Sequence, residues 1–143
     1  GMVGGQALDI LSENMNSDEN ILSEIHRRKT GALIVASVKA GAIVSGAGKN
    51  KTLALSRYGL NLGLAFQIAD DILNVTGDST IMGKKAGSDV ARGKLTYPSV
   101  LGMDAARQKL QYHVDEAIAS LTAFDERARP LRVIARYIEN RQE

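Results

Sequence analysis

The sequence predicts an all-α protein, an antiparallel bundle of helices that forms a single domain over residues 1–143. Apolar residues recur every three or four positions along nearly the whole chain, which is the period of helices that bury one face. No stretch alternates apolar and polar residues for long enough to suggest a strand. Short polar or glycine-containing breaks separate the periodic segments, as expected where antiparallel helices are joined by turns.

The first three helices are expected at residues 3–15, about 19–44 and 51–76. Polar residues at 16–18 supply capping side chains before the second helix. Glycines and an asparagine at 46–50 mark the turn into the third. We expect the second helix to be long and to pack on one face, because apolar side chains recur in it at Ile21, Leu22, Ile25, Leu33, Ile34, Val38 and Ala42.

The segment from Ser79 to Tyr97 is rich in Gly, Lys and Asp and has little periodicity, so it is expected to be a loop or a short irregular helix. Pro98 suits a first helical turn. Two amphipathic helices should follow. One is expected on Leu110, Val114, Ala117, Ile118 and Leu121, and the last on Leu131, Ile134, Ala135 and Ile138.

Composition disfavours several classes of function. The net charge is only +2 and the basic residues are scattered, which argues against a nucleic-acid partner. The chain has no cysteine, so it has no disulfide or thiolate metal site and suits a reducing cytoplasm. Lys39 interrupts the most apolar run, at residues 32–44, and no signal peptide is visible at the start, so we expect a cytoplasmic protein with no membrane span.

Two adjacent carboxylates, Asp70 and Asp71, lie inside an otherwise apolar helical stretch. Buried carboxylates need a cationic partner or become neutral. At helical spacing Gln67 and Asn74 flank them on one side, which gives a set of oxygen ligands that suits Mg²⁺. A helix cap or a surface acidic pair is the structural alternative, and this segment alone does not decide between them.

Four ordered motifs identify a family. FQIADDILN at 66–74 is followed by MGKKAGSDVARGKLTYP at 82–98, and GMVGGQALDI at 1–10 and HRRKTGALI at 26–34 precede them. Together they resemble the trans-isoprenyl diphosphate synthases, the polyprenyl synthetase family, and within it the short-chain farnesyl or geranylgeranyl type. The resemblance implies the carboxy-terminal part of an isoprenoid-synthase fold and a prenyltransferase that condenses isopentenyl diphosphate with an allylic diphosphate.

The same resemblance implies roles for individual residues. Asp70 would bind Mg²⁺ directly, Asp71 through water or as a bridge, and Asn74 through a water molecule. Lys29, Asp70 and Lys84 would be catalytic, because cations and metal ions stabilise the departing pyrophosphate. Substrate contacts would come from Gln6, Lys29, Thr30, Phe66, Gln67, Lys84 and Lys94.

Most of these residues have an ordinary structural alternative. A lone lysine such as Lys29 usually extends to solvent, and Lys84 and Lys94 would otherwise be solvated loop charges. Gln6 and Asp9 could be a surface pair, and Asp89 would support the loop. Phe66 could equally be core packing. His26 and His113 have no metal-ligand spacing, so both are expected on helix surfaces.

The chain also departs from the family pattern. The first aspartate-rich motif and the earlier basic residues of the family are not in this sequence, and Asn74 stands where the motif usually ends in aspartate. We therefore expect the carboxy-terminal half of an enzyme that is homodimeric when complete. This half should be inactive without its amino-terminal half or a second chain.

A non-catalytic diphosphate-binding subunit or pseudoenzyme of a split prenyltransferase is the main alternative. A terpene cyclase relative is disfavoured by the GKLTYP segment at 93–98. A helical interaction domain without a ligand would require four ordered motifs to be accidental. The residues that set product chain length precede the first aspartate motif in the family, so the product length is not encoded in this segment.

Overall fold

The structure, a computed structural model, describes residues 1–13, 18–76 and 94–141. Every regular element within these ranges is helical, so the predicted all-α class is confirmed. A π turn, η1, and a 3₁₀ turn, η2, accompany the α-helices. In chain order the elements are α1 (Met2–Leu11), α2 (Glu19–His26), η1 (Arg27–Gly31), α3 (Ala32–Val44), α4 (Lys49–Thr76), α7 (Tyr97–Leu101), α8 (Met103–Ala119), η2 (Glu126–Ala128) and α9 (Arg129–Glu139).

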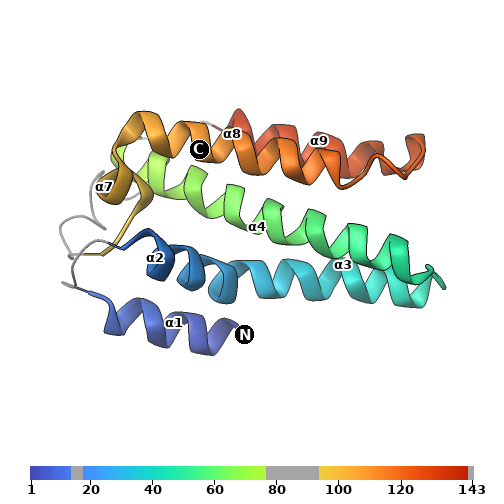
Figure 1. The fold of residues 1–143 in the computed structure, drawn as a ribbon, viewed down its shortest axis with the longest axis horizontal. Helices are drawn as coiled ribbons and strands as arrows, with labels where there is room; N and C mark the ends of the chain where they lie inside the picture. The colour runs from blue at the N-terminus through green and yellow to red at the C-terminus, as the bar shows by residue number, and fades with distance from the viewer. Residues whose placement is uncertain (14–17, 77–93, 142–143) are drawn as a thin grey trace.

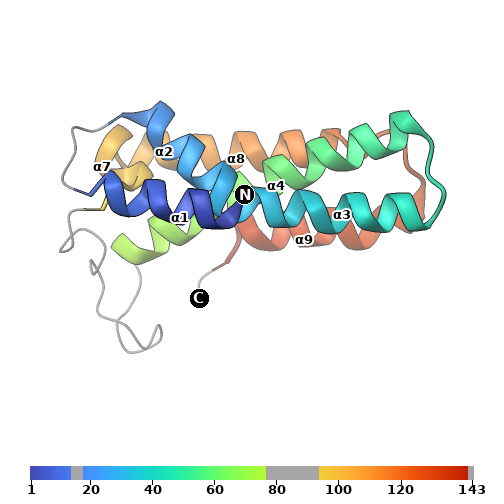
Figure 2. The ribbon, with the colours of Figure 1, turned by 90° about the horizontal axis from the view of Figure 1, so that it is seen from below.

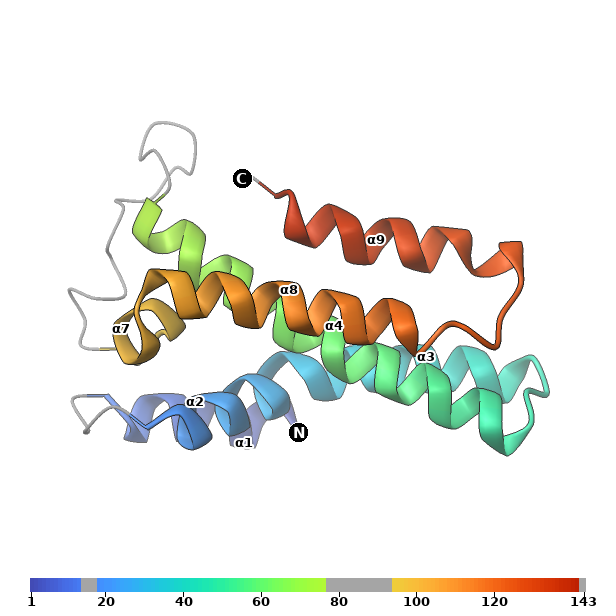
Figure 3. The same cartoon turned by 45° about the horizontal axis from the view of Figure 1, so that its top comes forward.

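Helix α4 is the central element of the bundle. On one side of it α2, η1 and α3 run end to end, and α8 lies along the opposite side (Figure 1). Helix α1 packs on α2 and η1, as the view from below shows (Figure 2). Helix α9 packs beside α8 and also reaches α4 (Figure 3). No helix within the described ranges is both long and apolar enough to span a membrane.

The helix starts follow the local sequence. The Asp18 side chain accepts a hydrogen bond from Asn20 N at 2.7 Å and caps α2. Thr96 caps α7 through Ser99, and Pro98 lies in its first turn, as predicted. This helix is short, however, because Gly102 takes a positive φ of 83° and a second helix, α8, starts beyond it.

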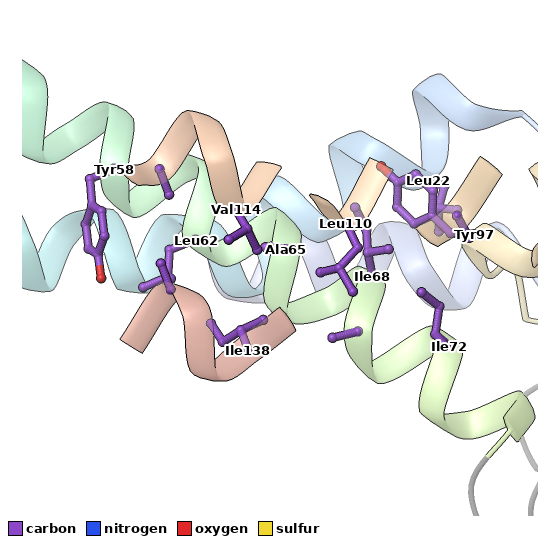
Figure 4. Close-up of a cluster of buried hydrophobic side chains, with 14 of the residues drawn as sticks. Leu22, Tyr58, Leu62, Ala65, Ile68, Ile72, Tyr97, Leu110, Val114 and Ile138 are labelled. Carbon is purple, nitrogen blue, oxygen red and sulfur yellow. The ribbon is translucent and has the colours of Figure 1, made fainter. Parts of the chain in front are cut away.

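The core lies between α4, α8 and α9, with α2 and α7 closing one end (Figure 4). Tyr58 is fully buried, and its hydroxyl donates to the backbone oxygen of Leu131 at 2.9 Å, which joins α4 to α9. The periodic positions of the expected helices therefore meet in one cluster. Its members include Leu22, Tyr58, Leu62, Ala65, Ile68, Ile72, Tyr97, Leu110, Val114 and Ile138.

The helix expected to run unbroken over 19–44 contains a π turn, so that expectation was wrong in the middle of the segment. The Ala32 amide donates to the oxygen of Arg27, five residues earlier, rather than four. The expected packed face does not continue through the turn, since Ile25 before it is buried whereas Leu33 after it is 61% exposed. The residues of the turn include Lys29 and Thr30.

Candidate diphosphate site

The adjacent carboxylates of α4 point in different directions. Asp71 is only 6% exposed, whereas Asp70 is exposed. Asp71 Oδ2 lies 3.2 Å from His26 Nε2 and accepts the Tyr97 amide at 2.9 Å. Where the sequence predicted a cation, the structure places two hydrogen-bond partners of the protein at the buried Asp71 carboxylate. A metal role for Asp71 stays a prediction, and it would have to use the other oxygen.

His26 was expected on a helix surface, and that expectation was wrong. Its exposure is 5%, and its ring stacks on Tyr97 with centroids 5.6 Å apart. Nδ1 is buried and has no hydrogen-bond partner among the described residues. The signal was in the sequence, because His26 follows the buried Leu22 by four positions and therefore shares its helix face.

His113 is also not a surface residue. It is half-buried on α8, and its Nδ1 lies 2.9 Å from Asn61 Oδ1 on α4. Burial, together with the nearby Lys109 charge, lowers the pKa of His113. This histidine therefore joins two core helices.

Lys29 forms an ion pair with Asp9, with 2.7 Å between Nζ and Oδ2, and both side chains are partly buried. The alternative of a lysine simply extended into water does not describe it. The pair joins η1 to α1, the helix that also carries Gln6, whose side chain is exposed. Sequence reasoning gave Asp9 little weight, although its distance of four residues from the buried Gly5 places it on the packed face of α1.

Thr30 and Gln67, predicted separately, meet in the structure. The Thr30 hydroxyl donates to Gln67 Oε1, which joins η1 to α4. Gln67 is one helical turn before Asp70 and Asp71. Two consecutive residues of η1 therefore contact different helices. Lys29 contacts Asp9 of α1, and Thr30 contacts Gln67 of α4.

The remaining predicted residues lie around this centre. Phe66 packs against the core, and the Arg141 guanidinium lies 5.2 Å from its ring centroid. Asn74 is 9% exposed on α4, and Lys94 is half-buried just before α7. Lys84, and Asp89 with it, lies outside the described residues.

The ligands for a metal ion are few in the described part of the chain, where no three His, Cys, Asp or Glu side chains are grouped to hold an ion. Mg²⁺ does not need such a cage, because it usually binds one or two carboxylates and keeps water and phosphate oxygens. The exposed Asp70 carboxylate, with Asn74 one turn later, fits this pattern. The site fits a magnesium ion bound together with a phosphate-bearing ligand.

A family comparison agrees with this geometry. The family model for polyprenyl synthetase matches residues 1–132. The chain belongs to the polyprenyl synthetase family. This polyprenyl synthetase segment is 43% identical over 145 residues to the farnesyl diphosphate synthase of Escherichia coli K12, covering 99% of this chain and 48% of that protein. It is 41% identical to the geranylgeranyl diphosphate synthase of Cyanophora paradoxa, covering 99% of this chain and 47% of that protein.

Solved polyprenyl synthetase structures have the same fold. A geranyltransferase from Helicobacter pylori, complexed with magnesium and isoprenyl diphosphate, aligns with a TM-score of 0.78 and 34% identity, over 98% of this chain and 46% of that one. A polyprenyl synthase from Caulobacter crescentus, with calcium and isoprenyl diphosphate, aligns with a TM-score of 0.92 and 28% identity, over 99% of this chain and 56% of that one. The chain thus spans about half the length of the relatives it matches.

Proposed function

We propose that this chain is the diphosphate-binding half of a prenyltransferase that joins isopentenyl diphosphate to an allylic diphosphate, forming farnesyl or geranylgeranyl diphosphate. The observation that carries the proposal is the meeting of Thr30 and Gln67 beside the Lys29–Asp9 pair. These polar groups come from three elements, and Gln67 is one turn from the exposed Asp70. Relatives of known name that share this segment make the same class of product.

The chemistry follows from the charges that these residues supply. The bond between the allylic carbon and the diphosphate oxygen breaks, the alkene of isopentenyl diphosphate attacks the allylic cation, and the released pyrophosphate takes up the proton that the new carbon chain loses. Mg²⁺, when bound, supplies positive charge to the departing pyrophosphate. Lys29 supplies a further positive charge, and Asp70 holds the ion. The hydrogen bond between Thr30 and Gln67 holds η1, which carries Lys29, against α4, which carries Asp70.

The other half of the apparatus would come from outside this chain. Large apolar side chains are exposed on α1, α3 and the start of α4, and apolar surface of this kind marks contact with another segment. They are Met2, Val3, Ile10, Leu11, Leu33, Ile43, Val44 and Leu53. We infer that an amino-terminal half, such as the relatives contain, covers part of this surface and adds the remaining Mg²⁺ ligands. The chain alone should not elongate prenyl substrates.

A chimera tests the proposal directly. The segment of the Escherichia coli farnesyl diphosphate synthase that matches this chain is replaced by this chain, and the product is assayed with geranyl diphosphate, isopentenyl diphosphate and Mg²⁺. We expect farnesyl diphosphate or a longer product from the chimera and none from the 143-residue chain alone. An inactive chimera that is folded, or an active isolated chain, would contradict the proposal.

A non-catalytic diphosphate-binding subunit is the second candidate, and Asn74 favours it. An amide in place of a carboxylate removes a negative charge that would hold Mg²⁺. In that case the chimera would bind pyrophosphate with Mg²⁺ but release no prenyl product, and restoring the charge with Asn74→Asp would restore turnover.

A further inference from the structure

The backbone of η1 is enclosed between two glycines from other helices. A Cβ atom on Gly5 of α1 would lie 2.7 Å from Lys29 Cα and 2.8 Å from the carbonyl carbon of Arg28. A Cβ atom on Gly63 of α4 would lie 2.7 Å from Gly31 Cα. Carbon atoms at such distances overlap, and the atoms they would meet are backbone atoms that cannot rotate away. Each contact therefore requires a residue without a side chain.

The π turn connects the close contacts of these glycines to the directions of the polar side chains of η1. A π turn holds one more residue than the α-helical turn it replaces, so it changes the direction of its own side chains while the helices on both sides continue. In η1 this places Lys29 against Asp9 of α1 and Thr30 against Gln67 of α4. The glycines lie on the same two sides, Gly5 beneath Lys29 and Gly63 beneath Gly31.

We propose that Gly5 and Gly63 are positioning residues that hold the π turn Arg27–Gly31 in place, and that this turn directs Lys29 and Thr30 into the diphosphate site. Gly5 acts through Lys29, and Gly63 acts through Thr30. The inference rests on the proposed function, since it assigns a purpose to the residues of that same site. It predicts that the glycines matter for ligand affinity beyond their effect on folding.

The chain offers a matched control for each glycine. Gly4 is the neighbour of Gly5 on α1, and Gly41 lies on α3; a Cβ atom at either position would meet nothing within 4 Å. Alanine is the better helix former, so Gly4→Ala and Gly41→Ala should leave the melting temperature unchanged or raise it. Gly5→Ala and Gly63→Ala add the same methyl group, but at these positions it would overlap with backbone atoms of η1.

The first experiment measures binding of pyrophosphate with Mg²⁺ to the chimera by calorimetry. We expect Gly5→Ala to weaken binding by about tenfold or more, the loss typical of one charge-assisted phosphate contact, while Gly4→Ala leaves it unchanged. Adding Gly5→Ala to Lys29→Ala should change the affinity less than twofold, because the residue through which Gly5 acts is already gone. A purely structural effect would be the same in both backgrounds, and that result would overturn the proposal.

The second glycine is tested with the allylic substrate, whose diphosphate the proposal places beside Thr30. Gly63→Ala should raise the KM for geranyl diphosphate severalfold relative to Gly41→Ala, and a Thr30→Ala background should remove most of that difference. Equal KM values for Gly63→Ala and Gly41→Ala would contradict the assignment of Gly63.

The third experiment removes the π turn without adding any side chain. Deletion of Arg28, which is exposed, shortens the turn by one residue and allows a continuous α-helix. Arg28→Ala is the control, because it removes the same charge, and the same exposed pair with Glu24, but keeps the turn. We expect both variants to fold and only the deletion to lose pyrophosphate affinity.

The outcomes separate the two proposals. Equal affinity in the deletion and in Arg28→Ala, or unfolding of the deletion variant, would overturn the positioning role. A chimera that binds pyrophosphate but makes no prenyl product would contradict the proposed function while leaving the positioning test valid. A chimera that does not bind pyrophosphate at all would contradict both.

Discussion

His26 Nε2 lies 3.2 Å from Asp71 Oδ2, and the same oxygen accepts the backbone amide of Tyr97 at 2.9 Å. One buried carboxylate therefore joins α2, α4 and the start of α7. Its neighbour Asp70 is turned by about 100° around the helix, which places it on the exposed side. Asp71 thus joins the helices, and the proposed function assigns the ligand to Asp70.

The histidine contact should be important for stability. His26→Ala leaves Asp71 buried with one fewer donor, so we expect a loss of about 1.5–3 kcal/mol in the free energy of unfolding at pH 7, typical of a hydrogen bond to a charged group. His113→Ala is the matched control, because His113 contacts the neutral Asn61 amide and is less buried. It should cost about 1 kcal/mol from the hydrogen bond. Equal losses in urea titrations of the two chimera variants would refute the special role of the His26–Asp71 contact.

Substitution of each aspartate should separate the two tasks. Asp70→Asn should abolish the Mg²⁺ dependence of pyrophosphate binding with little change in melting temperature, because Asp70 is exposed. Asp71→Asn should lower the melting temperature, because a neutral amide oxygen accepts from His26 and Tyr97 more weakly than a carboxylate oxygen does. The two variants are compared by calorimetry and thermal unfolding. The division of tasks is wrong if Asp71→Asn loses Mg²⁺ dependence at an unchanged melting temperature.

The amide at position 74 should tune the metal requirement. Asn74→Asp adds a nearly buried carboxylate one turn from Asp70, so we expect a lower melting temperature without Mg²⁺. With pyrophosphate present, the Mg²⁺ concentration for half-maximal binding should fall severalfold. Asn50→Asp, an exposed change of the same charge in the first turn of α4, should produce neither effect. If the half-maximal Mg²⁺ concentration does not change in Asn74→Asp, Asn74 takes no part in binding the metal ion.

Alkaline pH should destabilise the bundle through Tyr58. Burial raises the pKa of Tyr58 to about 12, so the unfolded chain ionises first, near pH 10. The contribution is fully present below pH 10 and is lost as the pH rises toward 12. Tyr58→Phe should lower the free energy of unfolding by about 1 kcal/mol at pH 7, because it removes the hydrogen bond to Leu131. Above pH 10 the free energy of unfolding of this variant should fall less steeply with pH than that of the unsubstituted protein. Tyr137→Phe, at an exposed position, serves as the control. Parallel pH profiles for all three proteins would contradict the prediction.

Much of this arrangement was predictable from local sequence. The helical class, the helix starts at Asp18 and Pro98 and the buried faces of α4 and α8 follow from spacing and capping residues. The helix predicted over 3–15 is present as α1 but ends earlier, at Leu11, and the last two helices lie where their apolar positions placed them.

The features that were not predictable depend on contacts between distant segments. The π turn at Arg27–Gly31 was not visible in the apolar pattern, which placed Leu33 on the buried face although it is exposed. The inward direction of Asp71 and its contact with His26 arise from α2 and α7 packing on α4, and the two partners of the hydrogen bond are 45 positions apart in the sequence. Asp9 was undervalued because its partner, Lys29, lies on another element.

Two lysines in the chimera show most directly whether polar groups of this chain act on the diphosphate. Lys29 lies in the π turn and is paired with Asp9, whereas Lys39 is exposed on α3. Loss of a charge-assisted phosphate contact should reduce kcat/KM for geranyl diphosphate by about 10- to 150-fold in Lys29→Ala. We expect Lys39→Ala to match the unsubstituted chimera at equal melting temperature. Equal kcat/KM values for the two folded variants would show that Lys29 does not act on the diphosphate.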